Sequence, residues 1–264
     1  MGTGWSGGAA VAYEMSFARL CAGAVPAILA ALPSAATGRL LDVGAGTGRL
    51  SVAAAARGWR VTALEPDEDM LAVARSRGAK GVEWISGGAP GIPFPDRMFD
   101  HAVASFVVNH VASPRRTLRD MVRVVVPGGR VIATVWEASK GEINQLWQAV
   151  TSVKGFEAPP ARRLPPEEDF ERSPEGLARL GEECGLEVAA ARTVSWEFVI
   201  EPGDLWQGPE HGIAGIGRAY LAQDETVRER MRSAYDEVAA AMAQDGLLHL
   251  RSHAVLVEAV VPTT

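Results

Sequence analysis

The feature that most constrains the fold of this chain is a short apolar segment followed by a glycine-rich turn and an alanine-rich segment. Residues 39–43 (RLLDV) are typical of a buried strand, and residues 47–57 favour a helix. The turn between them, DVGAGTG at residues 42–48, holds three glycines, which permit a tight turn and a close approach of the backbone to a ligand. The amides at the start of the following helix favour a negatively charged group. A ligand-binding turn is therefore predicted at the end of this strand.

The same order of strand and helix continues through the first half of the chain. Further strands are predicted at residues 60–64, 82–85, 99–106 and 130–136, and helices at residues 67–77 and 114–125. One or two amphipathic helices, broken near Pro26, are predicted over residues 14–32. Because alternating strands and helices pair in parallel through right-handed crossovers, the pattern predicts a doubly wound α/β sheet.

The regular alternation ends after Trp136. Residues 137–172 are rich in proline and show no clean period. A helix is predicted over residues 173–184, followed by a strand over 187–200, irregular helical structure over 204–245 and a last strand over 247–261. We therefore expect seven strands in all.

Composition and charge exclude several classes of protein. The chain of 264 residues is 47% hydrophobic and 22% charged, as in ordinary globular domains. A formal net charge of -6 argues against a general nucleic-acid binder, which needs clustered basic side chains. The two cysteines, Cys21 and Cys184, have no spacing suited to a metal site or a disulfide framework, so no metal is expected. The apolar run at residues 20–32 is too short to span a bilayer, and we expect a soluble, cytoplasmic protein.

A carboxylate supports the binding of a nucleoside-containing cofactor at the glycine turn. Glu65 ends the second predicted strand, about 20 residues after the turn, where this architecture places an acceptor for ribose hydroxyls. The dinucleotide fingerprint G-x-G-x-x-G does not match, since the third glycine arrives one residue early. A nicotinamide oxidoreductase is disfavoured for this reason.

Four segments resemble the class I S-adenosylmethionine-dependent methyltransferases in order and spacing. The glycine turn resembles motif I, and residues 61–71 (VTALEPDEDML) resemble motif II. Residues 87–111 resemble the adenine loop and motif IV, and residues 121–136 resemble the turn and fifth strand that follow them. The resemblance implies a mostly parallel, seven-stranded Rossmann-like sheet with a helical cap insertion. It also implies S-adenosyl-L-methionine as the cofactor.

The resemblance implies a role for each matching residue. Asp42, Gly44, Ala45 and Gly46 would hold the methionine part of the cofactor, and Glu65 would accept its ribose hydroxyls. The remaining cofactor contacts would come from Pro66, Met70, Gly88 and Ala89 beside the adenine, Phe106 beside the transferred methyl group, and Tyr13 and Phe17 in an N-terminal lid. Gly44 and Gly46 could instead serve only the turn, and Phe17, Met70 and Phe106 only the core.

A general base is needed only when the methyl acceptor must lose a proton. His110, after the fourth predicted strand, and His211, in the irregular second half, are the candidates, because histidine titrates in the required range. Positioning of the reactants without a base is the alternative.

The implied enzyme is a methyltransferase that acts on a small organic acceptor at O, N or C in specialised metabolism. The alternatives are a non-methylating use of the same cofactor, such as cyclisation, and a methyltransferase for RNA or protein. Residues 1–136 would form the N-terminal helices and the cofactor-binding half, residues 137–172 and 200–245 the substrate cover, and residues 173–199 and 246–264 the rest of the sheet. No membrane or nucleic-acid partner is expected, and a homodimer stays open.

Overall fold

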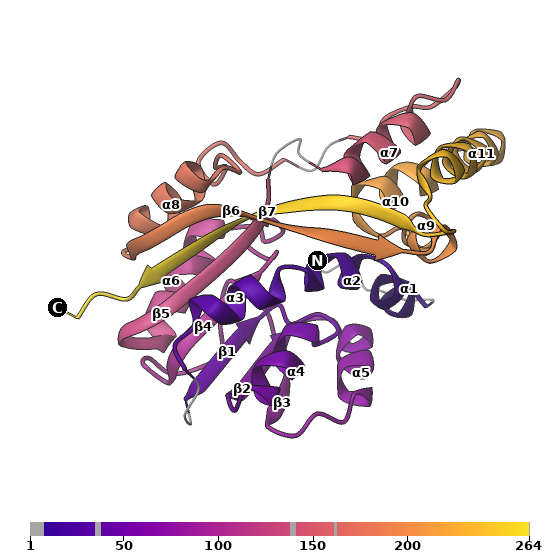
Figure 1. The fold of residues 1–264 in the computed structure, drawn as a ribbon. Helices are drawn as coiled ribbons and strands as arrows, with labels where there is room; N and C mark the ends of the chain where they lie inside the picture. The colour runs from indigo at the N-terminus through magenta and orange to yellow at the C-terminus, as the bar shows by residue number, and fades with distance from the viewer. Residues whose placement is uncertain (1–7, 35–37, 138–140, 161–162, 264) are drawn as a thin grey trace.

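A seven-stranded sheet with the strand order β3-β2-β1-β4-β5-β7-β6 forms the centre of the molecule (Figure 1). The computed structural model describes residues 8–34, 38–137, 141–160 and 163–263. Strands β1 to β5 run parallel, and β7 lies antiparallel between β5 and β6. The strands are β1 (Arg39–Val43), β2 (Arg60–Glu65), β3 (Val82–Ser86), β4 (Phe99–Ser105), β5 (Val125–Trp136), β6 (Glu187–Ile200) and β7 (Leu248–Val260). The predicted doubly wound, mostly parallel sheet is confirmed.

The first strand shows why the sheet is covered on both faces. Because successive side chains of a strand point to opposite faces, Leu40 and Leu41 enter different cores. Leu40 packs in a cluster with Ile28 of α3 (Val25–Ala31) and with α4 (Arg49–Ala56). Leu41 packs in a cluster with α6 (Pro114–Val124) and α8 (Pro174–Glu183). The central strands are therefore buried between two helical layers.

Helix ends follow the capping residues in the sequence. Asp67 accepts hydrogen bonds from the amides of Asp69 and Met70 and so begins α5 (Glu68–Ser76). Ser173 accepts from the amide of Gly176 at the start of α8. Asp224 accepts from the amide of Val227 and begins the longest helix, α11 (Glu225–Met242).

The N-terminal segment forms three short helices, where one or two were predicted. They are α1 (Ala9–Met15), α2 (Phe17–Ala22) and α3. The first break lies at Ser16, whose hydroxyl donates to the carbonyl of Ala12 at 2.6 Å. The second break lies at Gly23 and Ala24, just before Pro26 in the first turn of α3, so the predicted break near Pro26 is confirmed.

A third core lies where β6 and β7 extend past β5. It contains Trp206 of α9 (Pro202–Glu210), Tyr235 of α11 and Leu146 of α7 (Glu142–Thr151), all fully buried. With α10 (Ala214–Leu221), these helices gather at one end of the long β6–β7 pair (Figure 1). The helix α7 lies in the proline-rich stretch for which the sequence predicts no regular structure.

No single helix in the part of the chain that the structure describes is long and apolar enough to cross a membrane. The bent pair of Ala9–Met15 and Phe17–Ala31 meets the length and composition requirements when the two are taken together.

Candidate functional site

The glycine turn lies at the carboxyl end of β1, between β2 and β4. Gly44 and Gly46 have φ angles of +69° and +57°, in the left-handed region that favours glycine. A side chain at Gly44 would also place its Cβ 2.5 Å from Cγ2 of Val107. Glycine is therefore required at these positions for the turn itself, whatever else the turn binds.

The carboxylate of Glu65 ties the end of β2 to the turn. Its Oε2 accepts a hydrogen bond from the amide of Gly46 at 2.8 Å, and its Oε1 accepts one from the amide of Asp67 at 3.1 Å. Burial raises the pKa of this carboxyl, although the two amide hydrogen bonds oppose the shift. Since a carboxylate has about four acceptor positions, these two bonds leave acceptor capacity for a ligand with hydroxyl groups.

Asp42 is the second buried carboxylate of the site, only 1% exposed. Its Oδ2 accepts a hydrogen bond from the hydroxyl of Ser51 at 2.6 Å. Burial raises its pKa to about 6. The hydrogen bond from Ser51 opposes this rise, and the nearby negative charge of Glu65 adds to it. A buried carboxylate without a cationic partner is costly, which is typical of a residue kept for binding.

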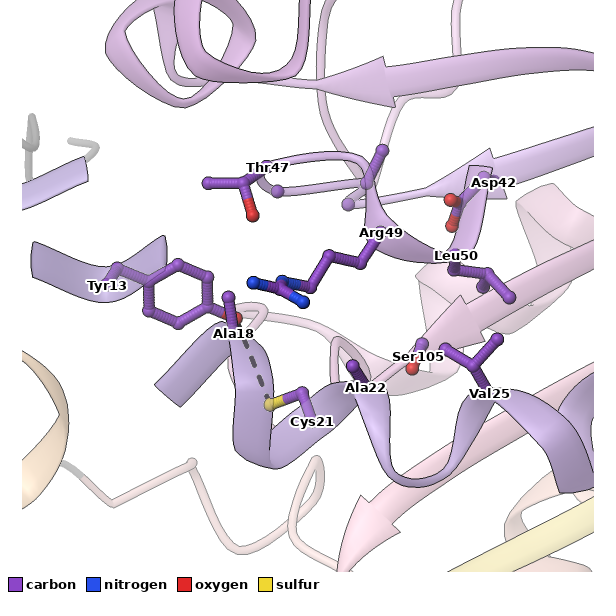
Figure 2. A pocket seen from close by; sticks show the side chains of 13 residues that line it. Tyr13, Ala18, Cys21, Ala22, Val25, Asp42, Thr47, Arg49, Leu50 and Ser105 are labelled. Atoms are coloured by element: carbon purple, nitrogen blue, oxygen red, sulfur yellow. Dashed lines mark hydrogen bonds between the residues drawn. The ribbon is translucent and has the colours of Figure 1, made fainter. Parts of the chain in front are cut away.

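A small cavity of about 50 Å³ lies between the turn and the N-terminal helices (Figure 2). It brings together five of the predicted cofactor contacts, namely Tyr13, Asp42, Gly44, Ala45 and Gly46. The remaining lining residues were not predicted: Ala18, Cys21, Ala22, Val25, Thr47, Arg49, Leu50 and Ser105.

Glu14 connects helix α1 to the glycine turn, to α4 and to the end of α5 through hydrogen bonds and ion pairs. The Glu14 carboxylate accepts a hydrogen bond from the hydroxyl of Thr47 at 2.5 Å and pairs with Arg49 and Arg77, each at 2.5 Å. Burial of this carboxyl would raise its pKa, but the hydrogen bonds from Thr47, Arg77 and Arg49 together lower it. Glu14 is therefore ionised at neutral pH, and it links the N-terminal helices to the glycine turn.

The amides of the turn already have acceptors within the protein. Those of Gly44 and Ala45 donate to the carbonyl of Leu64 at 2.8 and 3.1 Å, and that of Gly46 donates to Glu65. The amide of Gly48 donates to the carbonyl of Ala45 at 2.9 Å. Only Gly48, the N-cap of α4, belongs to the helix start for which a negative group is expected, so that expectation stays a prediction.

The residues predicted beside adenine lie next to Glu65 along the carboxyl edge. Gly88 is in close contact with Pro66, since a Cβ on Gly88 would lie 3.3 Å from Cβ of Pro66. Met70 is buried in α5, and Ala89 packs against the core cluster that contains Leu41. Pro66 and Gly88 are therefore brought together, whereas Met70 and Ala89 also serve the packing of the core.

Two predicted aromatic contacts pack away from the cavity. The ring of Phe106 stacks on Trp136 with centroids 4.2 Å apart, and Trp196 lies edge-on at 6.5 Å. Phe17 packs against Gly208 of α9 and the third core. Neither ring lines the cavity, and their assignment to the cofactor stays a prediction.

The two candidate bases lie outside the cavity lining. His110 follows β4 and has its pKa lowered, first by desolvation of the ring and then by the positive charge of Arg218. Nδ1 of His211 bonds to the carbonyl oxygen of Gln207 at 2.9 Å. Because a carbonyl accepts, Nδ1 is the protonated nitrogen and Nε2 is left as an acceptor. Nε2 faces the start of α1, 3.9 Å from the position of a Cβ on Gly8.

Comparison with known proteins identifies the segment that carries this site. Residues 41–133 match the family described as a methyltransferase domain. This segment is similar to a methyltransferase domain. A putative methyltransferase from Bacillus halodurans has a similar fold, with a TM-score of 0.57 at 20% identity over 90% of this chain and 99% of that one.

Curated relatives match the methyltransferase domain and little more. A demethylmenaquinone methyltransferase from Clavibacter sepedonicus is 43% identical over 96 residues, which are 36% of this chain and 39% of the relative. A malonyl-[acyl-carrier protein] O-methyltransferase from Erwinia pyrifoliae is 37% identical over 113 residues, 42% of this chain and 43% of the relative. The matches therefore span less than half the length of these relatives.

Proposed function

We propose that this chain binds S-adenosyl-L-methionine and transfers its methyl group to a small organic acceptor. The observation that carries the proposal is the buried carboxylate of Glu65, held by the amides of Gly46 and Asp67 at the carboxyl edge of a methyltransferase domain. When bound, the cofactor supplies a methyl group on a sulfonium centre.

The residues of the site fit this cofactor. Glu65 offers acceptor positions to a ribose diol, and Asp42 offers a buried carboxylate to an ammonium group. Pro66 and Gly88 provide an apolar surface beside Glu65 for a flat ring. The phenol ring of Tyr13 lines the cavity near Glu65, where a cation would be attracted to its face.

The acceptor is proposed to bind under the segments 137–172 and 200–245, which would act as a cover. The relatives are named for demethylmenaquinone and for a malonyl group on acyl-carrier protein. For this chain we propose another small organic acceptor, one of specialised metabolism. The residues of this chain would position the acceptor and exclude water, which can remove much of the barrier to an in-line displacement. His110 and His211 would accept a proton if the acceptor has one to lose.

The direct test is to incubate the purified chain with S-adenosylmethionine and either a demethylmenaquinol analogue or malonyl-loaded acyl-carrier protein. Mass spectrometry should find S-adenosylhomocysteine and an acceptor heavier by one methylene unit. Methylthioadenosine as the by-product would support the alternative of a non-methylating displacement. If calorimetry detects no binding of S-adenosylhomocysteine, the proposed function is wrong.

The two histidines are expected to affect turnover and not cofactor binding, because neither lines the cavity. His110→Ala and His211→Ala should each lower kcat about 10-fold or more if the residue is the base, which is the low end for general-base catalysis. The dissociation constant for S-adenosylhomocysteine should change less than twofold, as measured by calorimetry. Full turnover in both variants would leave positioning as the whole mechanism.

Cofactor affinity should fall in acid. Asp42, with a pKa of about 6, and Glu65, with a raised pKa, must both be ionised to receive an ammonium group and ribose hydroxyls. Affinity is therefore greatest above pH 6 and should drop up to about tenfold per pH unit below it. Calorimetric titration with S-adenosylhomocysteine from pH 5 to pH 8 checks this, and an affinity independent of pH would contradict it.

A further inference from the structure

The cavity beside the glycine turn carries one cation and one carboxylate. Among the described residues that line it, Arg49 is the only basic one and Asp42 the only acidic one. The pKa values of Tyr13 and Cys21 are both raised, mainly by burial, so these two groups are neutral at pH 7. A pair of this kind is complementary to an amino acid, whose ammonium and carboxylate groups carry opposite charges.

The guanidinium of Arg49 is incompletely satisfied. Its Nη2 donates to the Glu14 carboxylate and, at 3.4 Å, to the Glu14 carbonyl. Its Nε is buried and has no hydrogen-bond acceptor among the described residues. Figure 2 shows the side chain of Arg49 reaching into the space between the turn and α1. An unpaired buried donor on a charged group is costly, and a bound anion would remove that cost.

The four paired amides of the glycine turn do not offer a substitute for this cation. The amides of Gly44, Ala45, Gly46 and Gly48 all donate within the protein, as described above. A carboxylate entering the cavity beside the turn would bind the guanidinium, which can form paired hydrogen bonds with it.

The carboxylate of Glu14 pairs with the guanidinium of Arg49 in this structure. This carboxylate lies between Arg49 and Arg77 and also receives the hydroxyl of Thr47. Glu14 belongs to α1, the helix that contributes Tyr13 to the lining of the cavity. An anion that pairs with Nη2 of Arg49 must therefore displace Glu14.

We propose that Arg49 binds the α-carboxylate of the amino-acid end of the cofactor, and that Glu14 is the internal anion that holds Arg49 until the cofactor replaces it. This inference rests on the proposed function, because it assigns the contacts of that cofactor. It makes Arg49 a binding residue and makes Glu14 a competitor for the same guanidinium.

The test compares two ligands that differ at the amino-acid end. S-adenosylhomocysteine has the α-carboxylate, and methylthioadenosine keeps the adenosine and the sulfur but lacks it. Calorimetry on Arg49→Gln should show about a 10-fold or larger loss of affinity for S-adenosylhomocysteine, the low end for a charge-assisted pair. The affinity for methylthioadenosine should change less than about twofold, since no charge pairs with that ligand at this end.

Glu14→Gln should have the opposite effect on the preference between the two ligands. Removing the internal anion frees Arg49, so the ratio of the affinity for S-adenosylhomocysteine to that for methylthioadenosine should rise. Loosening of α1 affects both ligands alike and cancels in this ratio. Arg75→Gln is the matched control, because Arg75 is an exposed arginine of α5 that pairs with Glu68, and its ratio should equal that of the wild type.

Several outcomes would overturn the inference. An equal loss for both ligands in Arg49→Gln would assign Arg49 a structural role only, and a falling ratio in Glu14→Gln would exclude competition. If Arg49→Gln fails to fold in a thermal melt, Arg49→Lys replaces it and should show an intermediate ratio; an unchanged ratio would again overturn the proposal. Wild-type protein that binds neither ligand would contradict the proposed function instead.

Discussion

Glu65→Gln is expected to weaken the binding of S-adenosylhomocysteine about 100-fold, which corresponds to the loss of two hydrogen bonds to a charged acceptor. The carboxylate accepts from the amides of Gly46 and Asp67 and would accept two ribose hydroxyls as well. A glutamine has one oxygen and one NH₂ group, so one of the two amides would face a donor. The variant thus loses acceptors for the ligand and also disturbs the turn.

Calorimetry with two ligands separates this effect from that of Arg49. Methylthioadenosine contains the ribose, so Glu65→Gln should weaken it as strongly as S-adenosylhomocysteine. Glu68→Gln is the control, because Glu68 is an acidic residue in the first turn of α5, paired with the exposed Arg75. If Glu65→Gln binds both ligands with affinities within twofold of those of the wild type, Glu65 does not bind the ribose hydroxyls.

The difference in the free energy of unfolding between Asp42→Asn and the wild type is expected to grow in favour of the variant as the pH rises. The pKa of Asp42 is about 6 in the folded protein against 3.8 for an unperturbed aspartate, so the folded state holds the proton more tightly. Ionisation of Asp42 therefore destabilises the fold above pH 6, and this penalty fades as the pH falls toward 4. Asparagine has no such titration and can still accept the bond from Ser51.

The expected size follows from the linkage between proton binding and stability. Between pH 5 and pH 7.5 the free energy of unfolding of Asp42→Asn, relative to the wild type, should increase by about 1.4 kcal/mol. Urea unfolding at the two pH values measures it. Asp100→Asn is the control, since hydrogen bonds and charge from Arg39 hold the pKa of Asp100 below its usual value despite the effect of burial. Its difference from the wild type should stay constant over this range, and a constant difference for Asp42→Asn would contradict the prediction.

The sheet could be predicted from the sequence because its strands are short apolar runs between clear turn signals. Four of the five parallel strands lie within one residue of their predicted bounds, whereas β5 begins at Val125, five residues before its predicted start. Asp67 and Ser173 cap the helices that they were expected to begin. These features depend on local residue types, which a single sequence displays. The helix α7 was missed because it depends on packing: Leu146 and Val150 are buried against distant helices, while the prolines that follow, from Pro159 on, indicate a loop.

The candidate site could be predicted only in part. The glycine turn and Glu65 form a motif in the sequence, and the structure joins them by the hydrogen bond from Gly46. The pairing of Glu14 with Arg49 crosses 35 positions, and no periodicity indicates it. Arg49 directly follows the third glycine, and a single cation at that position is the signal that could have led to it.

The β6–β7 pair has a consequence for engineering the acceptor range. From Ala254 to Val260, β7 pairs with both β5 and β6, whereas from Leu248 to His253 it pairs with β6 alone among the described strands. The outer halves of both strands supply Phe198 and Leu250 to the core shared with α9 and α11. The proposed cover would thus be built on a two-stranded arm continuous with the sheet. A chimaera that exchanges it with a relative must exchange the outer half of this arm too, with junctions placed inside the two strands and not in the loops beyond them.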